Sequence, residues 1–239
     1  MPEVKIENLN AFYKQKSGTF HIINDLNVVF PSGKISVIIG SSGCGKTTLL
    51  KSIIGLIDYE GKIFLDDIDA NTLTIQEKNI SYVSQNLSIF PNLTVFNNIA
   101  APLKSMRISG DEIRQRVFDA AEMLKITPCL TRKPKQISLG QCQRTAIARA
   151  LIKRPNLYIF DEPFSSLDNE TSFEIIQDMK EIFSKFDATV IFISHDVREA
   201  LMLADEIFVM ENGQIIAHDT PEQIVYCSHP DVEKYFKDL

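Results

Sequence analysis

The feature that most constrains the fold is a glycine-rich segment, GSSGCGKTT, at residues 40–48. It fits the pattern G-x-x-x-x-G-K-[ST], with Gly40, Gly45, Lys46 and Thr47 at the defining positions. A short apolar run, KISVII, comes directly before it, and a segment with a helical pattern follows it. This arrangement predicts a strand, a loop whose backbone N–H groups surround phosphate oxygens, and a helix whose dipole favours the same negative charge.

The residue types in this loop predict a nucleotide site. We expect Lys46 to reach the β- and γ-phosphates and the Thr47 hydroxyl to ligate Mg²⁺. Cys44 also lies in the loop, where a helix N-terminus would lower the pKa of its thiol. The alternative, which is the favoured interpretation, is that Cys44 is a small space-filling residue. The nucleotide-binding residues expected from the loop are Ser41, Gly43, Cys44, Gly45, Lys46, Thr47 and Thr48.

Strand and helix patterns alternate around this loop. Residues 1–30 contain short β-type runs, which end at a turn at 31–33. Further strands are expected at 61–65, 80–84, 157–161 and 189–194, and helices at 169–186 and 196–204. Asn212-Gly213, between two apolar runs, is a strong hairpin signal. Strands that alternate with helices predict a largely parallel sheet with helices on both faces.

Helical patterns dominate from residue 86 to residue 154. Ser109 and Glu112 have the spacing of a capping box at the start of one such helix. We therefore expect a single domain with a core made of residues 1–85 and 155–239 and a helical subdomain inserted at 86–154. The length of 239 residues suits one large domain of this kind.

Composition excludes several other classes of protein. The net charge is −6, with 25 Lys and Arg against 31 Asp and Glu, and there is no long basic tract, so nucleic acid is not expected as a ligand. The four cysteines form no CxxC pair, which favours free thiols in a reducing compartment. The N-terminus has no apolar signal core, and the apolar runs fall short of the roughly 20 residues that span a bilayer. We expect a soluble, cytoplasmic chain.

Three further strand ends carry polar residues suited to nucleotide chemistry. The strand LYIFD ends in Asp161 and Glu162, where an acid can hold Mg²⁺ and a second can polarise an attacking water. His195 follows the strand TVIFIS, and Gln85 follows the strand ISYVS. Because ligands of open α/β sheets bind beyond the carboxyl ends of the strands, we expect these four residues to serve one site.

A second candidate binding segment is QISLGQCQRTAIARAL, at residues 136–151. Ser138 and Gln141 have the spacing of a capping box, and the apolar residues that follow share one helical face. A polar helix start without acids is suited to bind an anion.

These pieces in this order resemble the ATP-binding cassette family. The resemblance rests on GSSGCGKTT, Gln85, ISLGQ, LYIFDEP, the segment SSLD ending at Asp168, and His195, and it covers essentially the whole chain. It implies an α/β fold: a phosphate-loop (RecA-like) nucleotide-binding core with an N-terminal antiparallel β subdomain and an inserted helical subdomain. It also implies a head-to-tail dimer that binds two ATP molecules with Mg²⁺ at its interface.

The resemblance assigns roles residue by residue. Tyr13 matches the aromatic residue that stacks on adenine, although the neighbouring Phe12 is a rival. The residues expected to serve the ATP in the same copy are Lys46, Thr47, Gln85, Asp161, Glu162 and His195, with Thr47, Gln85 and Asp161 as metal ligands and Glu162, His195 and Gln85 as catalytic groups. Ser138, Gly140 and Gln141 would face the γ-phosphate of ATP held by the other copy, and Asp168 would link the two sites.

Within the family, the chain looks most like the ATPase subunits of bacterial importers of small solutes. QNLSIFPNLTVFNNIAAPL and DEPFSSLD are among the passages that suggest this. The expected partners are a second copy of the chain, two transmembrane permease subunits and an extracytoplasmic substrate-binding protein, with the chain on the inner face of the cell membrane. The apolar stretch from Leu87 to Leu103 is a candidate surface for a permease helix, and subdomain core is the alternative.

Two other functions fit the motifs. One is a soluble ATPase of the same family that acts as a cofactor-assembly scaffold, and the other is a nucleotide-binding regulator with little hydrolysis. Leu139 bears on the second, because the family usually has glycine at that position. If the backbone there must be left-handed, Leu139 costs about 1–2 kcal/mol; if not, its side chain is available to pack against a partner.

Overall fold

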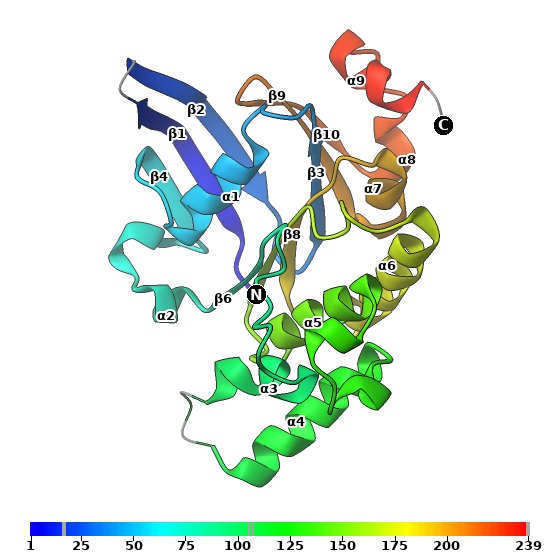
Figure 1. Ribbon diagram of the computed structural model, residues 1–239. Helices are drawn as coiled ribbons and strands as arrows, with labels where there is room; N and C mark the ends of the chain where they lie inside the picture. The colour runs from blue at the N-terminus through cyan, green and yellow to red at the C-terminus, as the bar shows by residue number, and fades with distance from the viewer. Residues whose placement is uncertain (16–17, 105, 107, 238–239) are drawn as a thin grey trace. The chain divides into compact units, whose positions relative to one another are not determined.

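The computed structural model describes residues 1–15, 18–104, 106 and 108–237, without the side chains of residues 13–15, 18 and 19. The chain forms two compact units (Figure 1). The first unit comprises Met1–Ile80, Asn156–Glu162 and Asp187–Leu239, and the second comprises Ser81–Pro155 and Pro163–Phe186.

A mainly parallel sheet forms the centre of the first unit. Its strands lie in the order β10-β9-β3-β8-β7, which are Gln214–Asp219, Glu206–Glu211, Ile35–Gly40, Thr189–Ile193 and Leu157–Asp161. The four strands from β9 to β7 run parallel, and β10 is antiparallel at the edge. Every residue of β3, β7 and β8 is buried, as expected for parallel strands covered on both faces. The predicted parallel sheet is thus confirmed.

The β9–β10 hairpin closes at Asn212 and Gly213, as the sequence predicts. Both residues have positive φ, 47° and 78°. A two-residue hairpin turn of this kind matches the twist of its strands and requires residues that tolerate a left-handed backbone.

A second, antiparallel sheet also belongs to the first unit. Its order is β2-β1-β4-β5, which are Gly18–Phe30, Val4–Gln15, Tyr59–Leu65 and Ile68–Asp69. The short β-type runs expected at the N-terminus are therefore parts of two long, irregular strands. The irregularities have a local cause: Asn8 and Asp25 are left-handed, and the Asn8 Nδ2 donates a 2.7 Å hydrogen bond to Asp25 Oδ1. This side-chain bond lies where the ladder between the strands is interrupted.

In the described part of the chain, five helices complete the first unit. They are α1 Lys46–Ile54, α2 Ile75–Lys78, α7 Val197–Leu203, α8 Pro221–Ile224 and α9 Pro230–Phe236. A 3₁₀ turn, Ala70–Thr72, lies between β5 and α2. Helix α1 contacts strands of both sheets, including β1, β2, β3 and β7. It therefore supplies apolar core between the sheets at the point where the glycine-rich loop ends.

The second unit is helical, and strand β6 (Ile80–Val83) leads into it. Its helices are α3 Val95–Ala100, α4 Gly110–Met123, α5 Leu139–Leu151 and α6 Asn169–Phe183, with 3₁₀ turns at Ala101–Leu103, Thr127–Cys129 and Pro134–Gln136. Ser109 caps α4, but Glu112 pairs with Arg116 rather than completing a capping box. In the described part of the chain, no helix is both long enough and apolar enough to cross a membrane.

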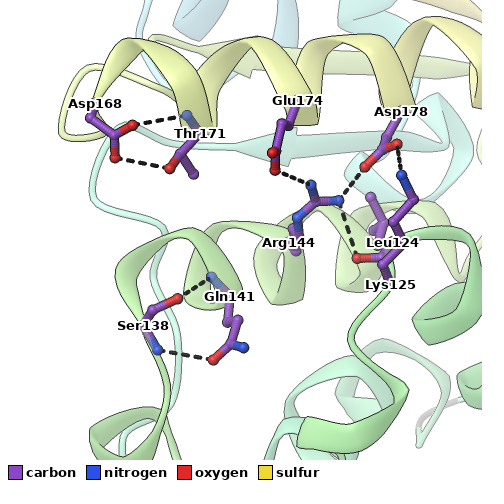
Figure 2. Close-up of polar contacts among 9 residues, drawn as sticks. All are labelled: Leu124, Lys125, Ser138, Gln141, Arg144, Asp168, Thr171, Glu174 and Asp178. Atoms are coloured by element: carbon purple, nitrogen blue, oxygen red, sulfur yellow. Dashed lines mark hydrogen bonds and ion pairs between the residues drawn. The ribbon is translucent and has the colours of Figure 1, made fainter.

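Helix α6 groups with the second unit, whereas the sequence placed residues 163–186 in the core. A buried ion pair explains part of this grouping: Arg144 on α5 pairs with Asp178 on α6 (Figure 2). The Arg144 guanidinium also donates to the Leu124 carbonyl at 3.2 Å, and Lys125 contacts Asp178 at 2.7 Å. These contacts join α5, α6 and the end of α4.

The apolar stretch from Leu87 to Leu103 is partly core and partly surface. Val95, Ile99 and Leu103 are fully buried, whereas the Phe90 side chain remains 49% exposed. Asn98 fixes the backbone beside Phe90, since its side chain accepts from Phe90 N at 2.8 Å and donates to Phe90 O at 3.1 Å. The interpretation as subdomain core therefore holds for the buried residues at 95 and 98–100 and for Leu103, whereas residues 88 and 90–92 lie on the surface.

The buried ion pair gives a prediction about stability. Asp178→Ala leaves Arg144 buried without its main partner and should lower the free energy of unfolding by about 3 kcal/mol in urea denaturation. Glu174→Ala is the matched control, because Glu174 is 67% exposed and lies 3.8 Å from the same guanidinium. The control should change stability little. Equal losses in the two variants would contradict the central role of Asp178.

Candidate functional site

The glycine-rich loop of residues 40–48 joins β3 to α1. Gly43 and Gly45 have φ of 82° and 114°, a backbone region that side chains other than glycine rarely adopt. Lys46 is 5% exposed and curls back over the loop, with its Nζ 2.8 Å from Gly40 O and 2.9 Å from Ser41 O. The Lys46 ammonium is buried against carbonyl dipoles, with the Cys44 sulfur 3.9 Å away, and a positive charge in this place suits an anionic ligand.

The β9–β10 hairpin supports the loop from beside it. Gly213 N donates to Cys44 O at 2.9 Å. Gly40 lies so close to the hairpin that an added Cβ would be 2.1 Å from Met210 O. Glycine is therefore required at position 40 by close packing, independently of any ligand.

Cys44 is a buried packing residue. Burial raises the pKa of its thiol, and the nearby positive charge of Lys46 only partly opposes this effect. The expectation of a lowered pKa at the helix N-terminus is therefore wrong, and the alternative of a space-filling residue is confirmed by its 6% exposure. The sulfur lies 2.9 Å from where a Cβ on Gly40 would be, so it fills the inside of the loop.

Thr47 and Asp161 come together although they are far apart in sequence. The Thr47 hydroxyl donates to Asp161 Oδ1 at 2.9 Å, and Asp161 is 4% exposed at the end of β7. A hydroxyl and a carboxylate oxygen are ligands that Mg²⁺ prefers, so this pair fits an Mg²⁺ ion whose shell is completed by phosphate and water. Within the described residues there is no cluster of three or more His, Cys, Asp or Glu that could hold a metal.

Glu162 and His195 are the next residues at the same sheet edge. His195 Nδ1 lies 3.9 Å from Glu162 Oε2, and the two side chains are 56% and 23% exposed. Glu162 has a φ of 45°, and its N donates to Ile193 O at 3.2 Å. A partly exposed carboxylate and imidazole at this distance can orient and deprotonate one water molecule between them and a substrate.

A buried carboxyl, Glu199, holds Ser194, the residue before His195, and no sequence pattern singled it out. Ser194 donates a 2.5 Å hydrogen bond to Glu199 Oε2 and accepts from Asp196 N at 2.9 Å. Burial raises the pKa of Glu199, with a partly opposing effect from the Ser194 hydrogen bond. The sequence could still have indicated this contact, because Glu199 lies about one helical turn after the strand end. An acid on the buried face of a short helix needs a hydrogen-bond partner.

Gln85 lies in the second unit at the start of an unusual turn. Its Nε2 is 3.4 Å from Ser165 Oγ. Leu87 and Ser88 follow with φ of 52° and 47°, and the Arg149 guanidinium on α5 donates to their carbonyl oxygens at 2.7 and 2.8 Å. Two successive left-handed residues are costly, so Arg149 stabilises a turn that would otherwise relax. No sequence pattern indicated this contact.

The predicted capping box at Ser138 and Gln141 is confirmed. Gln141 N donates to Ser138 Oγ at 3.2 Å, and Ser138 N donates to Gln141 Oε1 at 3.0 Å (Figure 2). Leu139 is the first residue of α5, is 48% exposed, and does not have a positive φ. The possibility of left-handed strain at Leu139 is therefore excluded. Gly140 is needed for packing, because a Cβ there would lie 2.8 Å from Thr171 Cγ2 on α6.

Asp168 caps α6 beside this segment. Its carboxylate accepts from Thr171 N at 2.9 Å and from Thr171 Oγ1 at 2.8 Å, and these hydrogen bonds lower the pKa of Asp168. Figure 2 shows Asp168 and Ser138 at the same end of the neighbouring helices α6 and α5.

The first unit thus brings together Lys46, Thr47, Asp161, Glu162 and His195 with the loop residues Ser41, Gly43, Cys44, Gly45 and Thr48. The second unit carries Gln85, Ser138, Gly140, Gln141 and Asp168. Tyr13 lies on β1, but its side chain is outside the described residues, so its predicted role is not addressed.

Comparison with known proteins identifies the family. Residues 23–165 match the model of the ABC transporter family, and this segment contains the glycine-rich loop, the Ser138 segment and both acids after β7.

The chain belongs to the ABC transporter family.

The curated relatives of this ABC chain carry names that describe them as import ATP-binding proteins. The sulfate/thiosulfate import ATP-binding protein CysA 2 of Rhizobium meliloti (strain 1021) is 38% identical over 95% of this chain and 62% of its own length. The spermidine/putrescine import ATP-binding protein PotA of Hahella chejuensis (strain KCTC 2396) is 38% identical over 87% of this chain and 58% of its own length. The chain therefore spans about three fifths of the length of these relatives.

Solved structures support the same fold. The dimeric structure of MJ0796, a bacterial ABC transporter cassette, has a TM-score of 0.82 at 30% identity and covers 91% of this chain and 98% of that one. A second structure of that cassette, described as a post-hydrolysis state bound to ADP and Pi, matches equally well, with a TM-score of 0.82 at 30% identity over 91% of this chain and 98% of that one. The expected phosphate-loop α/β fold is thus confirmed.

The environment of Cys44 gives a prediction about reactivity. Because burial and the raised pKa both reduce the exposed thiolate, iodoacetamide should alkylate Cys44 at least about ten-fold more slowly in the folded protein than in urea at the same pH. Peptide mapping by mass spectrometry follows each cysteine separately. Equal or faster labelling of Cys44 in the folded state would contradict the raised pKa and support a lowered one.

The conformation of Leu139 gives a second prediction. Since the backbone there is right-handed, Leu139→Gly removes no strain and should be less stable than Leu139→Ala by up to about 1 kcal/mol, the usual helix penalty of glycine. Urea denaturation of the two variants measures the difference. A glycine variant more stable than the alanine variant would mean that Leu139 is strained after all.

Proposed function

We propose that the chain is the ATP-binding and ATP-hydrolysing subunit of an ABC transporter that imports a small solute. The observation that carries the proposal is the contact between Thr47 and Asp161 directly beside the buried Lys46. A buried ammonium and two oxygen atoms of the kind Mg²⁺ prefers would thus lie where helix α1 begins, which supports a site for nucleotide phosphates. The membership in the ABC transporter family and the names of the relatives support the same function.

ATP would bind with its phosphates in the loop of residues 40–48. The backbone N–H groups between Gly43 and Thr48 would donate to phosphate oxygens, and Lys46 would turn from its carbonyl partners to the β- and γ-phosphates. Thr47 and Asp161 would hold an Mg²⁺ ion, with Gln85 as a third ligand. A bound Mg²⁺ would neutralise phosphate charge during hydrolysis.

Glu162 would act as the general base of hydrolysis. Its carboxylate would accept a proton from the attacking water, while His195, 3.9 Å away, would hydrogen-bond the γ-phosphate or the same water. Gln85 would help to orient that water. Tyr13 would stack on the adenine ring.

A second copy of the chain would complete each site. Ser138 uses its oxygen to cap α5, so its hydroxyl hydrogen can donate outward to a γ-phosphate held by the other copy. The Gly140 N–H and the Gln141 amide would donate to the same group, with the dipole of α5 behind them. Asp168, at the same end of α6, would link the two sites of a head-to-tail dimer, and the dimeric structure of the related cassette MJ0796 supports a dimer.

Binding of ATP would close the dimer and its hydrolysis would reopen it, which would move two attached transmembrane permease subunits. The chain would then lie on the cytoplasmic face of the cell membrane, and a substrate-binding protein would deliver the solute outside. The relatives' names cover sulfate/thiosulfate and spermidine/putrescine, so we propose no particular solute. Co-purification of integral membrane subunits with the tagged chain tests this part, and recovery of soluble partners alone would favour a cofactor-assembly or regulatory scaffold.

The role of Glu162 gives a prediction about turnover. Glu162→Gln keeps the shape of the side chain but removes the base, so ATP turnover should fall by about 10² to 10⁴-fold while ATP still binds. The variant should also form a stable dimer in ATP, because closure occurs without hydrolysis. Phosphate release and size-exclusion chromatography measure the two effects.

Glu222→Gln on α8 is the matched control, because it makes the same chemical change at an exposed position. Its turnover should equal that of the unmodified chain. Normal turnover in Glu162→Gln would refute the assignment of the base.

A further inference from the structure

Glu211 connects the phosphate loop to the hairpin strand β9. Its Oε1 accepts a 2.9 Å hydrogen bond from the Ser41 hydroxyl, and its side chain is 16% exposed. The contact follows from the sheet, since Gly40 and Met210 are register partners on β3 and β9. Ser41, the first residue after β3, and Glu211, the last residue of β9, follow these partners directly and therefore lie side by side.

Ser41 is consequently held on two sides. Its hydroxyl donates to Glu211, and its carbonyl accepts from Lys46 Nζ at 2.9 Å. Lys46 is the cation expected to bind phosphate. A change at Glu211 therefore reaches that cation through a single intervening residue.

A carboxylate beside a phosphate loop creates an electrostatic problem. The negative charge of Glu211 would repel bound phosphate. Hydrogen bonds and opposite charge from neighbouring groups offset this repulsion. The C-terminal helix α9 supplies both: the Tyr235 hydroxyl donates to Glu211 Oε2 at 2.8 Å, and Lys234 Nζ lies 3.4 Å from the same oxygen. Lys234 is 42% exposed and also lies 3.6 Å from Asp231, so Tyr235 is the more specific of the two contacts.

The ionisation states fit this arrangement. Burial alone would raise the pKa of Glu211, but the hydrogen bonds from Tyr235 and Ser41 and the charge of Lys234 lower it overall. Burial and the Glu211 carboxylate raise the pKa of Tyr235 to about 12. Glu211 is therefore a carboxylate and Tyr235 a phenol donor throughout the neutral pH range.

Helix α9 is a short element. It spans only Pro230–Phe236, a length at which an isolated helix is unstable in water, and Val232 is its fully buried apolar residue. The hydrogen bond from Tyr235 to Glu211 thus fixes the helix and the carboxylate at the same time.

We propose that Tyr235 is a positioning residue for the phosphate loop and acts through Glu211 and Ser41. This inference rests on the proposed function, because it requires ATP to bind at that loop. By holding Glu211, Tyr235 keeps the Ser41 hydroxyl bonded and so fixes the backbone at the start of the phosphate loop, whose shape the phosphates require. The C-terminal helix, 24 residues beyond Glu211 at Tyr235, thereby sets the affinity of the loop for ATP.

Tyr235→Phe tests the proposal because it removes one hydroxyl and keeps the ring. We expect the dissociation constant for Mg²⁺–ATP, titrated with a fluorescent ATP analogue, to rise about three- to ten-fold, as for loss of a hydrogen bond to a charged group. The turnover number at saturating ATP should change less than about two-fold, since the catalytic groups are untouched. The matched control is Tyr226→Phe, whose side chain is 84% exposed and whose ATP affinity should equal that of the unmodified chain.

A double-mutant cycle distinguishes positioning from a general structural effect. In a Glu211→Ala background, Tyr235→Phe should cause no further loss of ATP affinity, because the residue through which it acts is gone. An unchanged affinity in Tyr235→Phe alone, or the same fold loss in both backgrounds, would overturn the proposal. If the unmodified chain fails to bind ATP, the proposed function falls as well; if it binds and only the Tyr235 effect is absent, the proposed function stands.

Discussion

The hydrogen bond between Thr47 and Asp161 joins segments that are 114 residues apart, and the site of the first unit depends on it. It forms because β3, β8 and β7 are parallel neighbours, so their carboxyl ends meet at one edge of the sheet. The same edge receives Glu162 and His195. A different strand order would leave each motif locally intact and separate the groups, so the site is a consequence of the sheet topology.

Much of this topology could be predicted from the sequence. Buried parallel strands are nearly continuous apolar runs, and the runs that end before Ser41, at Asp161 and before His195 were recognisable for that reason. The Asn212-Gly213 hairpin was equally predictable, because few residue pairs tolerate the backbone conformation of its turn. The capping box at Ser138 was predictable for a similar reason, since its hydrogen bonds join residues three apart.

Other features depend on contacts that leave no local pattern. The pKa of Cys44 is set by burial against neighbours that only the folded loop provides, and the helix N-terminus suggested the opposite direction. Helix α6 groups with the helical unit partly through Asp178 and Arg144, an ion pair 34 residues apart that periodicity cannot indicate. Glu211 and Ser41 are 170 residues apart, so their contact was beyond sequence reasoning.

The backbone of Glu162 shows where function has priority over stability. A φ of 45° is unfavourable for a residue with a side chain and costs on the order of 1–3 kcal/mol, and the following Pro163 restricts this residue further. Glycine would adopt the same backbone with less strain but would carry no carboxylate. The hydrogen bond from Glu162 N to Ile193 O holds the strained conformation and anchors it to β8, the strand that leads to His195. Under the proposed function, an acid at a position where glycine would be more stable is explained by the need for a carboxylate 3.9 Å from His195 to act as the base of hydrolysis.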